Sequence, residues 1–274
     1  MSEDVSTATI TLNSGQRMPQ VGLGVWQSSG KTKSAVLAAL AAGYRHIDTA
    51  AVYGNEAQVG AAIAESGVPR EQLFITTKLW NKDQGYDPAL LAFDASMKRL
   101  KLEYLDLYLI HWPVPELRLQ SWRALERLHA DGRVRSIGVS NFLVPHLEQL
   151  QTTAKTLPAV NQIELSPFLQ RHDTVALSKK LGITLAAYSP LTRGERLGHP
   201  VVAELAARLQ RSPAQILLRW GVEHGFVVLP KSVTPARIEE NAKLFDFSLD
   251  AAALQQLDAL EEGLVTGWNP ANER

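Results

Sequence analysis

The chain has 274 residues, of which 45% are hydrophobic and 20% are charged, as is usual for a globular protein. Its 28 basic and 28 acidic residues give a formal net charge of zero, which argues against a nucleic-acid or membrane-surface partner. Cysteine is absent and no apolar run is long enough to span a membrane, so disulfides, thiolate nucleophiles, cysteine-ligated zinc and transmembrane helices are excluded.

The first predicted element is a β-hairpin over residues 7–19, where apolar alternation is interrupted by the turn residues Asn-Ser-Gly. Eight short, apolar, β-rich runs then recur along the chain, with stretches of helical period between them. The runs begin at Gln20, Arg45, Leu73, Leu105, Val134, Ala159, Ile183 and Phe226. The longest interval, before the last run, leaves room for a loop over residues 192–200 and two helical segments.

Strands that alternate with helices predict right-handed βαβ crossovers and a parallel sheet. Eight such units predict an α/β fold, a closed (β/α)8 TIM barrel preceded by the hairpin. No linker or change in composition marks a boundary, so we expect a single domain over residues 1–274. The alternative is an open doubly wound sheet, which favours a G-x-G-x-x-G turn after its first strand. Gly22 and Gly24 begin such a turn, but the third glycine is missing.

Four residues with acid–base side chains lie at or just beyond three consecutive strand ends. Asp48 ends the second predicted strand and Tyr53 follows on the next loop, while Lys78 ends the third strand and His111 the fourth. Active sites of barrels form at this end of the strands, so we expect one shared pocket. A lysine cation lowers the pKa of a nearby phenol, an aspartate keeps that lysine charged, and an imidazole can orient a carbonyl. The group is therefore predicted to protonate a carbonyl oxygen.

A metal site is a second interpretation of the same strands. His46 and Asp48 share one face of their strand, and with His111 they would begin a site of the kind used by barrel hydrolases. Only Glu164 and the pair His172–Asp173 offer further ligands nearby, and the pair is expected on a helix. This interpretation also leaves the lysine without a role, so we expect no metal.

Carbonyl reduction requires a hydride donor, which no side chain supplies, so a nicotinamide cofactor is expected. Hydroxyl, amide and aromatic groups suited to its carboxamide and ring end the fifth to seventh strands, at Ser140, Asn141, Gln162 and Tyr188. After the eighth strand come Lys231 and Ser232, then Arg237, Glu240 and Asn241 at helical spacing. The lysine and the arginine at this helix start suit a phosphate.

Seven motifs occur in order over nearly the whole chain: GYRHIDTAAVYGNE, TTKLWN, YLDLYLIHWP, IGVSNF, VNQIELSP, AYSPL and LPKSVTPARIEEN. In all of them the chain resembles the aldo-keto reductases. It looks most like the small bacterial members that reduce 2,5-diketo-gluconate, methylglyoxal and other aldehydes. The resemblance implies a barrel that binds NADPH without a Rossmann motif. It also implies a catalytic tetrad with Tyr53 as general acid, formed by Asp48, Tyr53, Lys78 and His111.

The same resemblance implies roles for the later strand ends. Ser140, Asn141 and Gln162 would hold the nicotinamide amide, and Tyr188 would stack on its ring. Ser189 and Leu191 would lie near the pyrophosphate. The adenosine 2'-phosphate and the adenine would contact Lys231, Ser232, Arg237, Glu240 and Asn241. Thr234 stands where some similar bacterial members carry a basic residue, but two cations remain for the phosphate, so NADPH is the expected cofactor.

Four tryptophans are predicted at loop positions, where they would form an aromatic rim for a substrate: Trp26, Trp80, Trp112 and Trp268. Two segments that enclose the pocket in many animal members are short in this chain. These are the stretch between Pro113 and a helix expected to begin near Ser121, and the tail over residues 263–274. Both predict an open, shallow pocket for small carbonyl compounds.

The remaining expectations concern setting and role. The first ten residues show no secretory signal pattern, so we expect a cytoplasmic protein. The sequence has no obvious apolar repeat that would indicate an oligomer, so we expect a monomer. The alternative to an enzyme is a nicotinamide-binding regulatory or sensor protein, because some barrels of the family resemble channel subunits. The complete acid–base group favours the enzyme.

Overall fold

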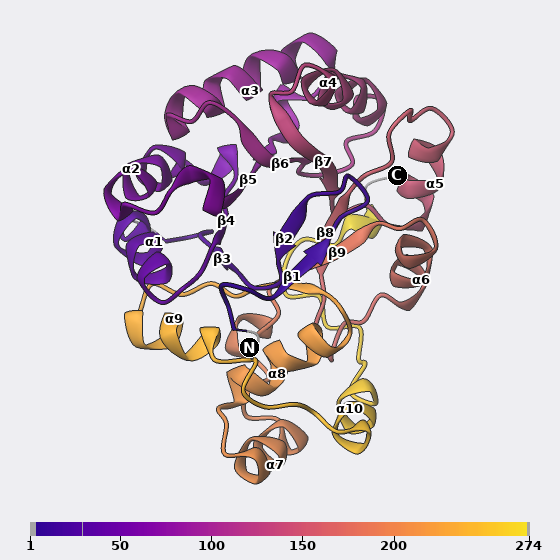
Figure 1. Cartoon of the computed structure of the whole chain (residues 1–274). Helices are drawn as coiled ribbons and strands as arrows, with labels where there is room; N and C mark the ends of the chain where they lie inside the picture. Colours follow the sequence, from indigo (N-terminus) through magenta and orange to yellow (C-terminus); the bar gives the residue numbers. More distant parts are fainter. Residues whose placement is uncertain (1–3, 29, 273–274) are drawn as a thin grey trace.

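The computed structural model describes residues 4–28 and 30–272, and its first element is a short antiparallel hairpin. Strands β1 (Thr9–Thr11) and β2 (Arg17–Pro19) pair with each other, as the sequence predicts. Leu12 and Met18 of this hairpin pack against side chains inside the barrel, such as Leu107. The hairpin therefore covers the amino-terminal end of the barrel, and Figure 1 shows it in front of the strands.

Within the described residues, eight parallel strands form one sheet that follows the order of the sequence. They are β3 (Gly22–Gly24), β4 (His46–Asp48), β5 (Phe74–Leu79), β6 (Leu105–Ile110), β7 (Val134–Ser140), β8 (Val160–Glu164), β9 (Thr184–Tyr188) and β10 (Val227–Leu229). The last strand returns to the first through parallel bridges that join Val21 to Val228 and Gly24 to Lys231. The sheet is thus a (β/α)8 barrel, which confirms the predicted fold and excludes the open doubly wound sheet.

Helices surround the barrel, and Figure 1 shows them as an outer ring. They are α1 (Thr32–Ala41), α2 (Glu56–Ser66), α3 (Tyr86–Leu100), α4 (Arg118–Ala130), α5 (Val144–Gln151), α6 (His172–Lys180), α7 (Pro200–Leu209), α8 (Pro213–Glu223), α9 (Pro235–Ala242) and α10 (Ala251–Asp258). Short 3-10 turns lie at η1 (Ala51–Tyr53), η2 (Arg70–Gln72), η3 (Asn81–Asp83), η4 (Thr192–Gly194) and η5 (Pro270–Asn272). Helices α7 and α8 occupy the long interval before β10, as the sequence predicts.

Helix α4 begins at Arg118, whereas the sequence suggests a start near Ser121. Arg118 is buried, and its guanidinium donates hydrogen bonds to the carbonyl oxygen of Pro113 at 2.9 Å and to Gln149 Oε1 at 2.5 Å. The Ser121 hydroxyl lies inside the helix, where it accepts a hydrogen bond from the Gly85 amide at 2.9 Å. Contacts with other elements therefore extend this helix toward its amino terminus, and no local signal in the sequence predicts them.

Alternate residues of each strand point into the barrel. On β5 the inward series is Phe74, Thr76 and Lys78, in which Phe74 joins the apolar cluster beneath the hairpin and Lys78 lies nearest the opposite end. Asp48 on β4 is aligned with Thr76, so it shares this inward face. The interior is tightly filled, because a Cβ atom added to Gly22 would lie 2.5 Å from His46 Nδ1. The barrel is thus apolar at the hairpin end and polar at its carboxyl end.

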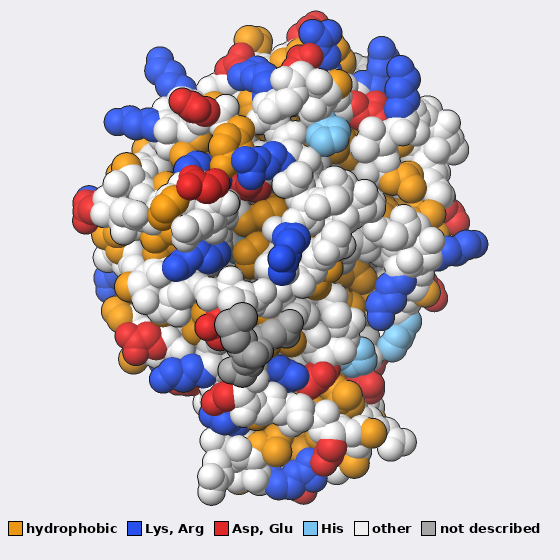
Figure 2. All heavy atoms as spheres, in the orientation of Figure 1, with side chains coloured by type: hydrophobic (Ala, Val, Ile, Leu, Met, Phe, Trp, Pro, Cys, Tyr) orange, Lys and Arg blue, Asp and Glu red, His pale blue; other side chains and the backbone are white. Residues whose placement is uncertain are grey.

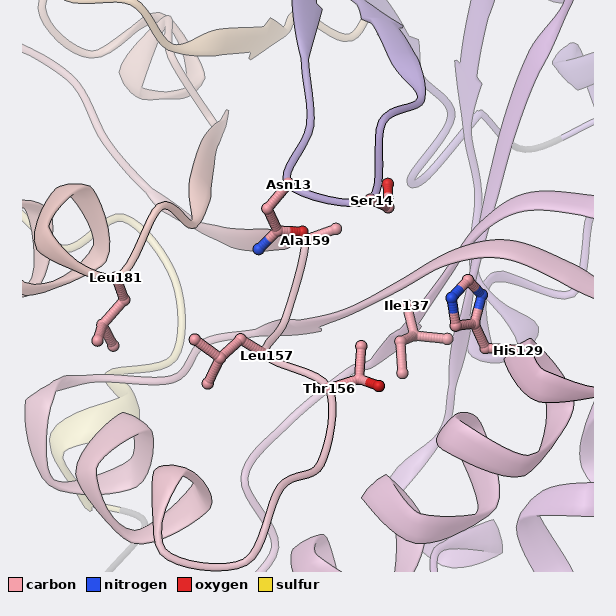
Figure 3. A pocket seen from close by; sticks show the side chains of 8 residues that line it. All are labelled: Asn13, Ser14, His129, Ile137, Thr156, Leu157, Ala159 and Leu181. Carbon is pink, nitrogen blue, oxygen red and sulfur yellow. The ribbon is translucent and has the colours of Figure 1, made fainter.

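A cavity of about 320 Å³ lies at the hairpin end, beside the turn that carries Asn13 and Ser14 (Figure 3). The polar groups of that turn already have partners. Asn13 Nδ2 donates a hydrogen bond to the carbonyl oxygen of Pro158 at 2.9 Å, and the hydroxyls of Ser14 and Ser136 are 2.7 Å apart. These bonds attach the hairpin turn to the barrel.

The surface at the hairpin end is of mixed charge. Figure 2 shows basic and acidic side chains interspersed over this face, in keeping with the balanced composition. Among the described residues, no helix combines the length and apolar character that crossing a bilayer requires.

Candidate active site

A buried ion pair lies at the carboxyl end of β4 and β5. Lys78 Nζ donates hydrogen bonds to Asp48 Oδ1 at 2.6 Å and to the carbonyl oxygen of Thr49 at 3.0 Å. It is also 3.5 Å from the phenolic oxygen of Tyr53, at the long end of the hydrogen-bond range. The Lys78 side chain is completely shielded from solvent. The strand register brings the lysine and the aspartate together, and turn η1 brings the tyrosine over them.

The pair determines the protonation states of its members. Burial has the largest single effect and favours a neutral Lys78, but Asp48 and Tyr53 together outweigh burial and raise the pKa of this lysine, which therefore stays charged. Burial raises the pKa of the Tyr53 phenol, and the Lys78 cation opposes that shift. The sequence predicts the lowering effect of the lysine, but the net direction is upward because burial contributes more. The phenol therefore carries its proton at neutral pH.

His111 follows directly after β6 and completes this group. Its ring lies edge-on to the Tyr53 ring, with centroids 5.8 Å apart, and edge-on to the Trp80 ring at 5.3 Å. Burial, together with the nearby Lys78 charge, lowers the pKa of His111 well below its usual value. The imidazole is therefore neutral at neutral pH and can donate one hydrogen bond from its protonated nitrogen.

The polar residues of the later strand ends are linked to the same group. Gln162 Nε2 donates a hydrogen bond to Asp48 Oδ2 at 2.8 Å, and Asn141 Nδ2 donates to the carbonyl oxygen of His111 at 2.9 Å. The Tyr188 hydroxyl donates to Asn141 Oδ1 at 2.8 Å. Gln162 lies in the middle of β8 rather than at its end, because the strand continues to Glu164. One hydrogen-bond network thus spans the mouth of the barrel.

These bonds also bear on the alternative metal site. Both carboxylate oxygens of Asp48 accept hydrogen bonds, and His46 Nε2 is 3.1 Å from the hydroxyl oxygen of Thr76. His172 and Asp173 begin helix α6. Across residues 4–28 and 30–272, no three histidine, aspartate or glutamate side chains are grouped so that they could hold a metal ion.

A large cavity of about 840 Å³ opens above this group, within the usual range for ligand sites. It brings together all the residues predicted for catalysis, cofactor and substrate except Lys78, which is fully buried beneath them. The cavity is lined by Asp48, Tyr53, His111, Ser140, Asn141, Gln162, Tyr188, Ser189, Leu191, Lys231, Ser232, Arg237, Glu240, Asn241, Trp26, Trp80, Trp112 and Trp268. The shared pocket that the sequence predicts therefore exists, while the role of each residue stays a prediction.

Two cations mark the end of the cavity next to helix α9. Lys231 and Arg237 are exposed, and neither forms an ion pair within the described part of the chain. The Ser232 hydroxyl accepts a hydrogen bond from the Thr234 amide at 3.1 Å, at the point where the helix begins. Cations without partners beside a helix amino terminus suit a phosphate group.

Some residues on the loop after β9 line the cavity although the sequence does not predict them, among them Arg193. Arg193 lies over the Trp26 ring, with its guanidinium carbon 4.8 Å from the ring centroid. Thr192 and Arg193 both adopt positive φ angles, which non-glycine residues rarely do. The adjacent Gly194 was the one local sign of a tight turn, but no sequence pattern indicates that the turn places its arginine over a tryptophan on another loop.

A parallel (β/α)8 barrel whose carboxyl end opens into a large polar and aromatic cavity has the architecture of a barrel enzyme. A model of the aldo/keto reductase family matches residues 20–262, and the chain belongs to this family. Its enzymes use nicotinamide cofactors and act on carbonyl compounds.

Individual relatives match over almost their whole length. Glyoxal reductase from Bacillus subtilis (strain 168) is 48% identical over 264 residues, which cover 96% of either chain. The crystal structure of an aldo/keto reductase from Brucella melitensis is 49% identical with a TM-score of 0.90, covering 92% of this chain and 99% of that one. An aldo-keto reductase from Bombyx mori, solved in complex with NADP, is 38% identical with a TM-score of 0.89 and 94% of either chain covered.

Proposed function

We propose that this protein is an NADPH-dependent reductase that converts small aldehydes and ketones to alcohols, with Tyr53 as the general acid. One observation carries the proposal. The buried Lys78 ammonium lies between Asp48 Oδ1, at 2.6 Å, and the Tyr53 phenolic oxygen, at 3.5 Å, directly beneath the large cavity. A protonated phenol with a cation behind it is arranged to give its proton to an oxygen in the cavity.

Each member of the group has its own task. Tyr53 donates the proton, and the Lys78 cation stabilises the phenolate that this leaves. Asp48 keeps Lys78 charged, and neutral His111 orients the substrate oxygen by a hydrogen bond. A nicotinamide cofactor, when bound, supplies the hydride that reaches the carbonyl carbon. The Tyr53 proton adds to the carbonyl oxygen and the hydride to the carbonyl carbon, which together give the alcohol.

The residues present fit such a cofactor. The cavity runs without interruption from the acid–base group to the unpaired Lys231 and Arg237, so one elongated dinucleotide would reach both ends. Ser140, Asn141 and Gln162 would hold the nicotinamide amide, and the Tyr188 ring would stack on the nicotinamide. Ser189 and Leu191 would lie beside the pyrophosphate. The phosphate and adenine of the adenosine would contact Lys231, Ser232, Arg237, Glu240 and Asn241.

Two exposed cations favour NADPH over NADH, because the 2'-phosphate adds negative charge at that point. NADP in the Bombyx mori relative supports this preference. Trp26, Trp80, Trp112 and Trp268 would form the substrate walls, which suits small carbonyls such as 2,5-diketo-gluconate, methylglyoxal or aromatic aldehydes. The glyoxal-reducing relative from Bacillus subtilis supports a small dicarbonyl.

A substrate panel tests the proposal. The purified protein is given NADPH or NADH with methylglyoxal, glyoxal and an aromatic aldehyde, and loss of the reduced cofactor is followed by absorbance. We expect turnover that is faster with NADPH. Tyr53→Phe should lower kcat by about 10²–10⁴-fold, the usual contribution of a general acid, while the Kd for NADPH is unchanged.

Tyr86→Phe on helix α3, which lies outside the cavity, is the matched control and should keep full activity. Tight NADPH binding without reduction of any carbonyl would instead favour the regulatory or sensor protein. Full activity of Tyr53→Phe would show that another group donates the proton.

A further inference from the structure

The chain beyond helix α10 lies along the loop that follows β8. We define the C-terminal segment as residues 261–268. The backbone amides of Glu262 and Leu264 donate hydrogen bonds to the carbonyl oxygen of Phe168 at 3.2 and 3.0 Å. The Glu261 carboxylate accepts a hydrogen bond from the Gln170 amide. The segment is therefore attached to the carboxyl end of the barrel, where the yellow end of the chain runs back toward β8 in Figure 1.

Glu164 makes the deepest of these attachments. It is the last residue of β8, is 3% exposed, and lies two positions beyond Gln162 on the same inward face. Its Oε1 accepts a hydrogen bond from the Thr266 amide at 2.9 Å and another from the Thr266 hydroxyl. Its Oε2 is buried and has no hydrogen-bond partner in the described part of the chain. One residue of the C-terminal segment is thus tied to a strand of the barrel.

We call the Glu164–Thr266 hydrogen bonds the tie. The tie helps to position Trp268, whose burial alone does not fix its place. Trp268 lies two residues after Thr266 and is 57% exposed, yet its ring is 5.1 Å from the ring of Trp112, measured between centroids. Both rings line the cavity. A ring that is mostly exposed gains little from packing, so its place depends on the backbone that carries it.

We propose that Glu164 is a positioning residue for substrate selection: it ties the C-terminal segment to the barrel so that Trp268 and Trp112 form one wall. The inference rests on the proposed function, because the wall selects among carbonyl substrates. Glu164 does not touch the reacting atoms. It sets how closely the Trp268 side of the cavity approaches a substrate.

The tie needs only an acceptor oxygen at the position of Oε1, which accepts both hydrogen bonds from Thr266. Burying a carboxylate whose second oxygen has no partner costs stability. Buried polar groups without partners are rare in native proteins, and they occur where function requires them. The place of Glu164, beside the network that includes Gln162, agrees with a role in the site.

The test compares variants on both sides of the tie. Thr266→Val removes the hydroxyl donor from a partly exposed position, and Thr266→Ser keeps it as the matched control. Glu164→Ala removes the acceptor, and Glu164→Gln keeps an acceptor oxygen of the same reach. Hydrogen exchange measures the protection of amides 262–268. Kinetics measures kcat and KM for an aromatic aldehyde and for methylglyoxal.

We expect Thr266→Val and Glu164→Ala to lose protection in the C-terminal segment. The KM for the aromatic aldehyde should rise about tenfold, as for other lost apolar contacts in a pocket, while kcat and the KM for methylglyoxal change little. Thr266→Ser and Glu164→Gln should restore both readouts toward those of the original chain.

Three results would overturn the inference. They are unchanged protection in both weakening variants, lost protection with no change in the KM for the aromatic aldehyde, or an equal loss of kcat for every substrate. If the original protein reduces no carbonyl, the proposed function fails, and the selective role fails with it, whereas the exchange data still decide whether Glu164 holds the segment.

Discussion

At the scale of single residues, the Asp48 carboxylate joins the two halves of the site. Its Oδ1 accepts a hydrogen bond from Lys78 and its Oδ2 one from Gln162. The first bond holds the lysine behind the proposed proton donor, Tyr53, and the second comes from a residue proposed to hold the nicotinamide amide. A mutation of Lys78 or Gln162 therefore affects the other residue through Asp48. The effects of mutating both are expected to be non-additive.

His46 lies beneath this group and gives the fold a dependence on pH. Burial lowers the pKa of His46 to about 4; the charge of Asp48 and a carbonyl of Pro19 oppose this shift, and the charge of Lys78 adds to it. Between pH 6.5 and pH 4 the unfolded chain therefore holds more protons at this residue than the folded protein. The contribution of His46 to the free energy of unfolding is therefore greatest above pH 6.5 and falls as the pH drops toward 4.

We expect His46→Gln to flatten this dependence, since glutamine does not titrate and can still bond to Thr76. The slope of the unfolding free energy between pH 6.5 and 4 should decrease by up to about 1.4 kcal/mol per pH unit. Urea denaturation at several pH values measures it. His111 contributes in the same direction, so the difference between the two proteins is the quantity to compare. His172→Gln, on the exposed start of α6, is the control, and an equal slope in all three proteins would contradict the prediction.

At the scale of elements, the sequence was sufficient for the hairpin, for all eight strands and for the two helices before β10. Short apolar runs and helical patterns carry that information, because each barrel strand is buried on both faces and each helix buries its inner stripe. The predicted strand ends also placed Asp48 and Lys78 at the same end of the barrel. These features depend on which residues are apolar along one stretch of chain, which is what a sequence displays directly.

The features that the sequence did not predict depend on partners from distant segments. Arg118 extends α4 because Pro113 and Gln149 accept its hydrogen bonds. Glu164 pairs with Thr266 near the other end of the chain. The net pKa shift of Tyr53 depends on how deeply the surrounding loops bury its phenol. None of these leaves a local pattern, because each requires two segments to meet.

The contact between α2 and α3 supplies a test at this scale. Gly60 lies in α2, where replacing glycine by alanine normally stabilises a helix by about 0.5–1 kcal/mol. A Cβ atom at Gly60, however, would lie 2.1 Å from the carbonyl oxygen of Leu100, and a backbone atom cannot easily move aside. We therefore expect Gly60→Ala to destabilise the protein by at least about 1–3 kcal/mol in urea denaturation. Gly198→Ala, which would meet no atom within 4 Å, is the control and should be neutral or slightly stabilising. Equal stability of the two variants would show that α2 and α3 can separate freely.

At the scale of the whole molecule, the two ends of the barrel have separate tasks. Inside the barrel, the hairpin end is apolar and filled, whereas the carboxyl end holds the polar network and the large cavity. Met18 of the hairpin is fully buried among interior side chains. Such a division predicts that packing defects at one end change stability without changing the chemistry at the other.

Met18→Ala tests this division. The loss of a fully buried side chain should lower the free energy of unfolding by about 2–5 kcal/mol. The KM for NADPH and the kcat at a temperature where the variant is folded should equal those of the original protein. Arg17→Ala, at the exposed neighbouring position, should stay within about 0.5 kcal/mol of the original. A large change in KM for Met18→Ala would mean that the two ends are coupled.

The junction between β3 and β10, where the barrel closes, has short strands and few backbone pairings; we call it the seam. Both strands are three residues long, and isolated bridges at Val21–Val228 and Gly24–Lys231 join them, whereas β5 and β6 pair over a longer register. Local opening of the ring should therefore begin at this seam. Lys231 lies just after β10 and Trp26 just after β3, and both residues line the cavity. A long ligand bound across both residues would hold the two strands together, so that ligand binding and closure of the barrel would be thermodynamically linked.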